Sequence, residues 1–213
     1  MTTDGAAVEP TQPVVPSEPL AMLVESLLFV ADEPVTAARL AAALGVELTQ
    51  VETAIAELSV NLQRRGIRLQ QKGDRVQLAT MPEAAAAIER FLGLEVSPRL
   101  SPAALETLAM IAYRQPMTRT QLEAVRGVNC DGVLRTLLSR GLIEEQGRLE
   151  AVGRPILYGT TFEFLQYFGL TQLQQLPALP DEVAIQLSAR AAQAQLAILD
   201  ETGVTEPLID ELI

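Results

Sequence analysis

Apolar residues between Leu100 and Leu170 recur first with the period of helices and then with the period of strands. Ser101 and Pro102 are residue types typical of a helix N-cap and of the first helical position. The apolar positions that follow are spaced by three and four, as on the buried face of a helix: Ala104, Leu105, Leu108, Ile111 and Ala112. Gln115-Pro116 ends this predicted helix.

Two shorter helices and a hairpin are predicted next. Thr118 begins a second helix, which ends before Gly127, and Asn129 begins a third, which Gly141 terminates as a left-handed C-cap glycine does. After these helices the period changes to two short β-prone runs, Leu142-Ile143 and Ile156 to Tyr158. They are joined by a loose, glycine-containing tip from Glu144 to Pro155. Three helices followed by a hairpin predict a winged helix.

The first half of the chain shows the same order of elements. Helical stripes are expected from Leu20 to Ala31, from Thr36 to Leu44, and from Thr49 until Gly66, followed by two strands around Lys72-Gly73-Asp74 and a closing helix. Five pairs of identical residues lie 82 positions apart, which suggests a tandem repeat: Pro34 and Pro116, Thr36 and Thr118, Leu40 and Leu122, Gly45 and Gly127, Val46 and Val128. The open alternative is that two unrelated winged helices share the same turn residues.

These patterns predict a mainly α fold with small β-hairpins, divided into four parts. Residues 1–19 contain four prolines and no helical period, so we expect a disordered arm, with a docking peptide as the open alternative. Residues 20–95 and 96–170 are the two predicted winged-helix domains. Residues 171–213 carry one basic and seven acidic side chains, and we expect an acidic extension with a helix from Asp181 to Leu199.

The composition argues against catalysis and against metal binding. The chain has no histidine, which removes His-based acid–base catalysis, Ser-His-Asp and Cys-His arrangements and His metal ligands. Its one cysteine, Cys130, excludes an intrachain disulfide and zinc sites that need several cysteines. No histidine can act as a base for its thiol, so we interpret Cys130 as a small buried or half-buried residue and not as a reactive one. We therefore expect no enzyme activity, no cofactor and no metal. No signal-peptide pattern and no run of about 18 apolar residues is present, so we expect a cytoplasmic protein.

The charge distribution argues against strong DNA binding. The chain has a net charge of −11, and the predicted DNA-reading helices, Thr49–Arg65 and Asn129–Arg140, carry Glu52, Glu57 and Asp131 toward their N-terminal halves. Carboxylates there repel phosphates. A modest positive patch around the second hairpin remains open: Arg126, Arg148 and Arg154. A winged-helix transcription regulator is the alternative function, but it needs basic reading helices.

The second half of the chain resembles the bacterial segregation and condensation protein B family. Four blocks carry the resemblance, in order over some seventy residues: AALETLAMIAYRQPMTR, RGVNCDGVLRTLLSRGLI, GRPILYGTT and FEFLQYFGL. The resemblance implies a non-enzymatic homodimer that binds a kleisin subunit and, through it, the SMC ATPase, in chromosome condensation and segregation. It also implies self-association through the N-terminal domain and kleisin binding by the C-terminal one, with localisation at the nucleoid through the complex.

Candidate contact residues come from apolar side chains that a small domain cannot cover. Residues 100–170 carry seven basic and seven acidic side chains, a neutral balance that suits a protein partner. The closing segment holds more large side chains than one face of a short helix can bury, and three residues near the first turn are candidates for the rim of the contact. The predicted partner-binding set is Phe162, Leu165, Tyr167, Tyr113, Arg114 and Met117. For Phe164 and Phe168 we favour a place in the core. Leu20 to Phe29 supplies the predicted dimer surface, because it has apolar residues on several faces.

Overall fold

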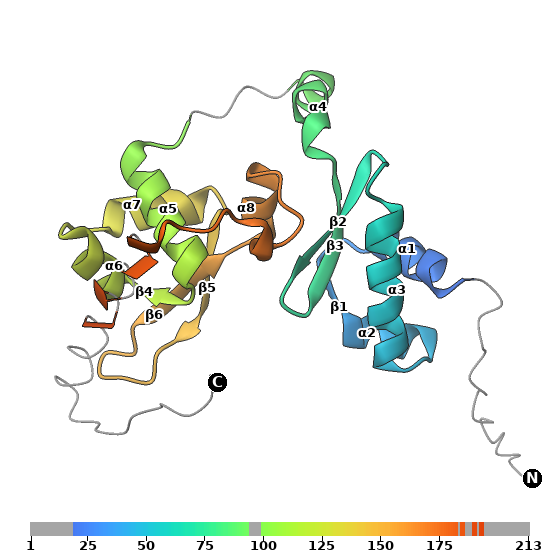
Figure 1. Ribbon diagram of the computed structural model, residues 1–213, viewed down its shortest axis with the longest axis horizontal. Coiled ribbons are helices and arrows are strands. Elements are labelled where there is room, and N and C mark those ends of the chain that lie inside the picture. Colours follow the sequence, from blue (N-terminus) through green and yellow to red (C-terminus); the bar gives the residue numbers. More distant parts are fainter. Residues whose placement is uncertain (1–18, 94–98, 183, 186–188, 191, 194–213) are drawn as a thin grey trace, which may run out of the picture. The chain divides into compact units, whose positions relative to one another are not determined.

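The computed structural model describes residues 19–93, 99–182, 184–185, 189–190 and 192–193 (Figure 1). The chain divides into two compact units, Met1–Arg90 and Phe91–Ile213. Both units are mainly helical with one small antiparallel sheet each. Residues 1–18 of the predicted arm and most of the predicted C-terminal helix lie outside the described residues, although positions 181–182, 184–185, 189–190 and 192–193 are helical.

The first unit places three helices against a three-stranded sheet (Figure 1). Its elements follow in the order α1 (Leu20–Val30), β1 (Val35–Thr36), α2 (Ala37–Leu44), α3 (Leu48–Asn61), β2 (Ile67–Lys72), β3 (Arg75–Thr80), a 3-10 turn (Pro82–Ala84) and α4 (Ala85–Leu92). β3 lies between β1 and β2 and pairs antiparallel with both, with Val35 opposite Val76 and Leu69 opposite Leu78. The hairpin is therefore tied to the start of α2 by the two-residue strand β1.

One apolar face of each helix forms the core of the first unit. α1 contributes Val24 and Leu28, α2 contributes Leu40, and the sheet contributes Leu69 and Val76. The buried residues of α3 and its C-cap are three and four positions apart, the spacing of a single helical stripe: Val51, Ala54, Ile55, Leu58 and Leu62. α2 is delimited as the sequence predicts. Thr36 Oγ1 accepts a hydrogen bond from Arg39 N at 3.2 Å, and Gly45 ends the helix in the left-handed region with φ of 65°.

The second unit repeats this order. It comprises α5 (Pro102–Arg114), β4 (Met117–Thr118), α6 (Arg119–Arg126), α7 (Asp131–Ser139), β5 (Ile143–Arg148), β6 (Ile156–Thr160), α8 (Phe162–Tyr167) and a 3-10 turn (Leu173–Gln175). β6 lies between β4 and β5, and all pairings are antiparallel. β1 with α2 and β4 with α6 start and end 82 residues apart, so the offset found in the sequence holds for these elements.

The core of the second unit is formed by the four helices α5 to α8 and the sheet. Its most deeply buried side chains are Leu108, Ile111, Leu122, Cys130, Leu137 and Leu165. The chain after α8 returns to this core, because Leu170, Leu173 and Leu176 pack against it. Tyr113 Oη donates a hydrogen bond to Pro177 O at 2.7 Å, which holds the returning segment on α5.

Two predicted helix starts are wrong by one or two residues. Glu47, not Thr49, is the N-cap of α3, and Gln50 Oε1 accepts a hydrogen bond from Glu47 N at 3.1 Å. Cys130, not Asn129, is the N-cap of α7, although Asn129 Oδ1 accepts a hydrogen bond from Asp131 N at 3.0 Å. In both cases the expected polar side chain is present, but a neighbouring residue occupies the cap position. α3 also ends at Asn61, before the predicted stop at Gly66.

Candidate protein-interaction surfaces

α8 exposes an aromatic pair at its end. Thr161 caps the helix, its Oγ1 accepting a hydrogen bond from Phe164 N at 3.1 Å. Tyr167 is 50% exposed and Phe168 43% exposed, so the prediction of a core position is wrong for Phe168, whereas Phe164 is buried as predicted. The two rings meet edge to face with centroids 5.1 Å apart, and Phe168 lies 4.9 Å from the buried Phe164. These geometries are favourable for aromatic pairs. The buried ring of Phe164 therefore supports the exposed ring of Phe168, which in turn contacts Tyr167.

Three of the predicted contact residues lie in the core instead. Phe162, Leu165 and Met117 are 8%, 0% and 2% exposed. The expectation assumed that a short helix buries one face against one neighbour, whereas α8 contributes to a core formed with α5, α6, α7 and the sheet. Met117 belongs to β4, where it lies opposite Tyr158 of β6. In this conformation these three side chains have almost no surface for a partner, which corrects the prediction that they contact one.

Tyr113 and Arg114 lie half-buried at the end of α5. The hydroxyl of Tyr113 bonds to Pro177 O, and its side chain lines a hollow with Leu173 and Leu176. The chain's own segment after α8 thus covers part of the surface that the sequence assigned to a partner. Arg114 is the basic residue in the last turn of α5.

α1 has two apolar faces, as the sequence predicts. Ala21, Val24 and Leu28 are buried, while Met22, Phe29 and Val30 are 57%, 77% and 70% exposed. Positions 22, 29 and 30 are separated by seven and eight residues, which places them on one side of the helix. A large exposed phenylalanine beside other apolar side chains is typical of an interaction surface.

The turn between α6 and α7 is held by charged side chains, of which Arg119 and Glu123 were not predicted from the sequence to have a role. Arg119 Nη1 bonds to Asp131 Oδ1 at 2.5 Å, and its Nε lies 3.6 Å from Glu123 Oε1. Glu123 Oε1 also accepts a hydrogen bond from Cys130 N at 3.0 Å. The bond to Asp131, followed by the charges of Asp131 and Glu123, raises the pKa of Arg119. No periodic pattern marks these residues, because the contacts join different elements.

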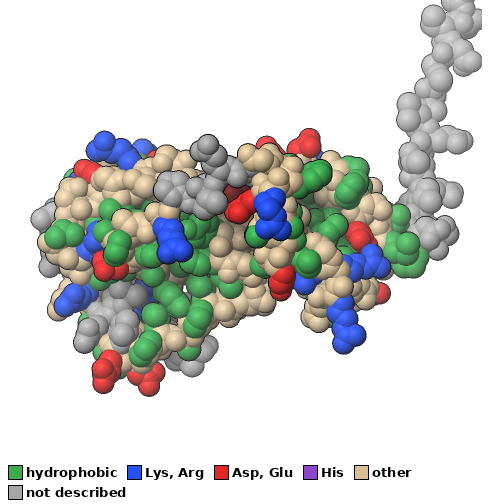
Figure 2. Space-filling view, turned by 90° about the horizontal axis from the view of Figure 1, so that it is seen from above, with side chains coloured by type: hydrophobic (Ala, Val, Ile, Leu, Met, Phe, Trp, Pro, Cys, Tyr) green, Lys and Arg blue, Asp and Glu red, His purple; other side chains and the backbone are tan. Residues whose placement is uncertain are grey.

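These contacts weaken the start of α7 as a phosphate-binding site. The backbone N–H groups of Cys130 and Asp131 are already bonded to Glu123 and Asn129, and Asp131 adds a negative charge there. The positive patch suggested by the sequence is also partly neutralised. Arg126 Nη2 lies 3.4 Å from Glu106 Oε2, whereas the bond of Arg148 Nη1 to Arg154 O at 3.1 Å leaves the charge of Arg148 in place. Figure 2 shows basic and acidic side chains interspersed over the face that it draws.

Cys130 is fully buried, in agreement with its interpretation as a core residue. Its Sγ lies 3.5 Å from Val128 O and 3.7 Å from Arg126 Nη1. Within the described residues no group of three or more His, Cys, Asp or Glu side chains could hold a metal ion. Across that same part of the chain, none of the helices combines the length and apolar character needed to cross a bilayer.

Comparison with known proteins assigns the family. The family model described as segregation and condensation complex subunit ScpB matches residues 22–179. Segregation and condensation protein B of Moorella thermoacetica is 50% identical over 189 residues, covering 88% of this chain and 96% of the relative. The crystal structure of ScpB from Mycobacterium tuberculosis is 42% identical, covers 71% of this chain and 96% of that chain, and has a TM-score of 0.35.

A second solved structure is a dimer of an ScpB N-terminal domain complexed with a ScpA peptide. It is 32% identical, covers 33% of this chain and 91% of that chain, and has a TM-score of 0.32. The family match extends from α1 through both units to the segment after α8, and half of the aligned residues are identical to the Moorella protein. The chain therefore belongs to the segregation and condensation protein B family.

Proposed function

We propose that this protein is a non-enzymatic adaptor that forms a homodimer and binds the kleisin subunit ScpA, and through it the SMC ATPase, in chromosome condensation and segregation. The observation that carries the proposal is the family match over residues 22–179, which includes both folded units. Names of relatives such as segregation and condensation protein B describe the process, and the surfaces of this chain suggest how it takes part.

The fold that we propose for each unit is a winged helix. Both units have the order helix, short strand, helix, helix, hairpin, with the second hairpin strand central in the sheet. We place the domains at residues 20–95 and 96–170, between the arm 1–19 and the acidic extension 171–213. The boundary of the two compact units, between Arg90 and Phe91, supports a domain boundary in this region.

We assign the dimer contact to the outer face of α1. Met22, Phe29 and Val30 form an apolar surface there that the first unit leaves uncovered. A two-fold interface uses the same patch on both protomers, and an exposed apolar stripe on a helix can pair with its own copy in this way.

We assign the ScpA contact to the second unit, at the aromatic pair Tyr167 and Phe168, and we keep Arg114 among the proposed contact residues. The two aromatic side chains are exposed, and Phe168 contacts the buried Phe164 while Tyr167 contacts Phe168. Aromatic and arginine side chains are enriched among residues that dominate protein interfaces. The neutral charge of this unit also favours a protein over DNA, and we expect contact with DNA to be weak or indirect.

The test is purification of the full chain with the ScpA protein from the same genome. Tyr167→Ser with Phe168→Ser should weaken ScpA retention by tenfold or more, because interface aromatics each contribute about 1–2 kcal/mol or more. Val152→Ser is the matched control, since Val152 is 74% exposed in the same unit but lies in the hairpin loop. Equal loss in both variants would refute the assignment to the α8 edge.

The dimer is tested in the same preparation by sedimentation. Phe29→Ser should shift the full chain toward monomer, whereas Phe91→Ser, which alters an 88% exposed phenylalanine of α4, should not. ScpA retention is measured for Phe29→Ser as well, because the solved ScpB N-terminal domain was crystallised as a dimer with a ScpA peptide. Loss of ScpA from Phe29→Ser alone would move the contact to the first unit.

A further inference from the structure

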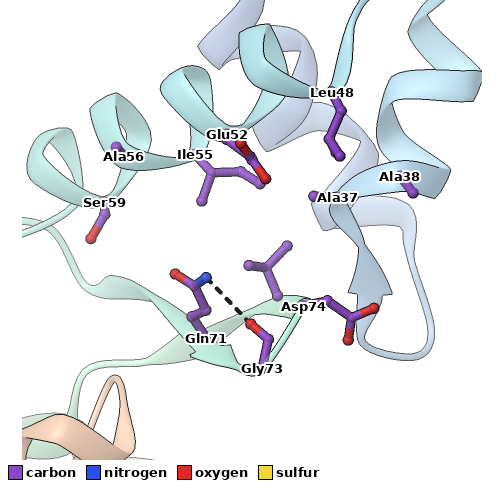
Figure 3. A pocket seen from close by; sticks show the side chains of 11 residues that line it. Ala37, Ala38, Leu48, Glu52, Ile55, Ala56, Ser59, Gln71, Gly73 and Asp74 are labelled. Carbon is purple, nitrogen blue, oxygen red and sulfur yellow. Dashed lines mark hydrogen bonds between the residues drawn. The ribbon is translucent and has the colours of Figure 1, made fainter. Parts of the chain in front are cut away.

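A groove in the first unit runs between α3 and the β2–β3 hairpin, with the start of α2 beside it (Figure 3). Its volume is about 530 Å³, within the range of ligand-binding pockets. Figure 3 shows Glu52 and Ile55 extending from α3 toward the hairpin residues Gln71 and Gly73, with open space between them. Gln71 Nε2 donates a hydrogen bond to Gly73 O at 3.4 Å, so the polar end of this side chain is held along the hairpin.

The groove has the length and apolar floor that suit a helix. Its lining on α3 runs from Leu48 to Ser59, which is three turns and about 16 Å at 1.5 Å per residue. Ile55 and Val76 are buried at its base, and Leu48 is 43% exposed at one end. A long open trough of this kind fits an amphipathic helix with apolar side chains three and four residues apart.

The charges of the groove specify the partner. Glu52 on α3 and Asp74 at the hairpin turn are exposed, they are the charged residues of the lining, and neither has an ion-pair partner in the described part of the chain. The cations closest in sequence, Lys72 and Arg75, are not part of the lining. Two uncompensated carboxylates repel phosphate and favour lysine or arginine side chains.

The second unit shows why this groove is open. Ala37 and Ala38 begin α2, and the residues 82 positions later are Arg119 and Thr120 at the start of α6. Arg119 spans from α6 to α7 and bonds to Asp131. In the first unit two methyl side chains stand at the corresponding places, so no side chain bridges the two helices there.

We infer that this groove docks an amphipathic helix of a partner protein, with apolar side chains entering beside Ile55 and Val76 and a lysine or arginine reaching Glu52 and Asp74. The surface shares no residue with the α1 and α8 surfaces assigned above. The inference therefore stands apart from the proposed dimer and ScpA contacts.

The test uses the full chain and two labelled synthetic peptides. One is a 15-residue amphipathic helix, about four turns long, with leucines at helical spacing flanked by lysines; its twin carries glutamate at each lysine position. Fluorescence anisotropy should show salt-sensitive binding of the lysine peptide and at least tenfold weaker binding of the glutamate peptide. Equal binding of the two peptides, or no binding of the lysine peptide, would overturn the inference.

Two pairs of variants locate the binding. Glu52→Lys should weaken binding of the lysine peptide about tenfold, because it turns one exposed attraction into a repulsion, and Glu57→Lys, on the same helix but outside the lining, should not. Ala38→Trp should obstruct the groove and abolish binding, and Ala43→Trp, also exposed on α2, is its control. Circular dichroism confirms that each variant is folded.

Other occupants give distinguishable results that would also overturn the inference. Duplex DNA bound more tightly than the lysine peptide, and lost in Ala38→Trp, would assign the groove to nucleic acid. Self-association of the full chain that disappears in Ala38→Trp but not in Ala43→Trp would assign it to a second copy.

Discussion

Gln115 joins the end of α5 to the end of β6, and its removal should destabilise the second unit strongly. Gln115 Oε1 accepts two hydrogen bonds from Thr160, one from its N–H at 2.7 Å and one from its hydroxyl at 3.0 Å. Thr160 is completely buried. In Gln115→Ala both donors lose their acceptor, and solvent cannot replace it without opening the fold.

The magnitude follows from the burial of these donors. Each buried donor left without a partner costs about 1–3 kcal/mol, and the hydroxyl has some freedom to rotate toward another acceptor. We therefore expect Gln115→Ala to lower the free energy of unfolding by about 2–4 kcal/mol. A domain of this size loses about 4–8 °C in Tm per kcal/mol, so the change is easily measured.

Tyrosine fluorescence reports the unfolding of the second unit selectively. The chain has no tryptophan and three tyrosines, Tyr113, Tyr158 and Tyr167, all within this unit. Urea titrations of the full chain should show the loss in Gln115→Ala and a change below about 0.5 kcal/mol in Gln166→Ala, an exposed glutamine on α8.

A double-mutant cycle with Thr160→Val isolates the hydroxyl contact and should give a coupling of about 1 kcal/mol. A loss below about 0.5 kcal/mol in Gln115→Ala would refute the reasoning that these donors lack an alternative acceptor.

Three further outcomes are expected. An added Cβ meets no atom within 4 Å at Gly127, which has a φ of 72°, or at Gly132, which is helical. In thermal melts Gly127→Ala should therefore lower the free energy of unfolding by about 1–2 kcal/mol, whereas Gly132→Ala should be neutral or stabilising. Burial, followed by the charge of Glu145, raises the pKa of Tyr158, so the neutral phenol is favoured in the folded state. The stability that this provides is present below about pH 10 and should be lost as the pH rises further. Urea titrations at several pH values should show this decrease in the free energy of unfolding for the unchanged chain and not for Tyr158→Phe. Limited proteolysis should cut between Gly93 and Leu100 early, and early cleavage within α5 to α7 would contradict the proposed domain boundary.

The elements of the fold were predictable because their ends are marked by local chemistry. Ser101 and Thr118 cap α5 and α6 through their side chains, and Gly127 ends α6 in the left-handed region. Such signals depend on the residue and its immediate neighbours. Where two nearby residues could each serve as the cap, as at Glu47 and Thr49, the sequence alone did not decide between them.

The contact residues were harder to predict, because exposure depends on which elements meet. Phe162 and Tyr167 belong to the same short helix, yet one is buried and the other is 50% exposed. The segment after α8 further changes the surface by binding Tyr113. Apolar periodicity indicates how much apolar surface a helix must cover. Which elements pack against each side of the helix, and so which of its side chains are buried, depends on the tertiary structure.

The motif blocks that carry the family resemblance show a related limit. Several of their polar residues bond within the second unit: Gln115 to Thr160, Arg119 to Asp131, Glu123 to Cys130 and Arg126 to Glu106. A recognisable block therefore identified the fold without marking the partner surface. The internal repeat is more informative on that point. At the 82-residue offset the capping Thr36 and Thr118 are identical, whereas the next residue is Ala37 in one unit and Arg119 in the other. The shared residues give the two units the same backbone. The differing residue decides whether a side chain bridges the two helices, α2 and α3 in the first unit and α6 and α7 in the second. Positions that differ between the repeats are therefore where the two units can acquire different partners.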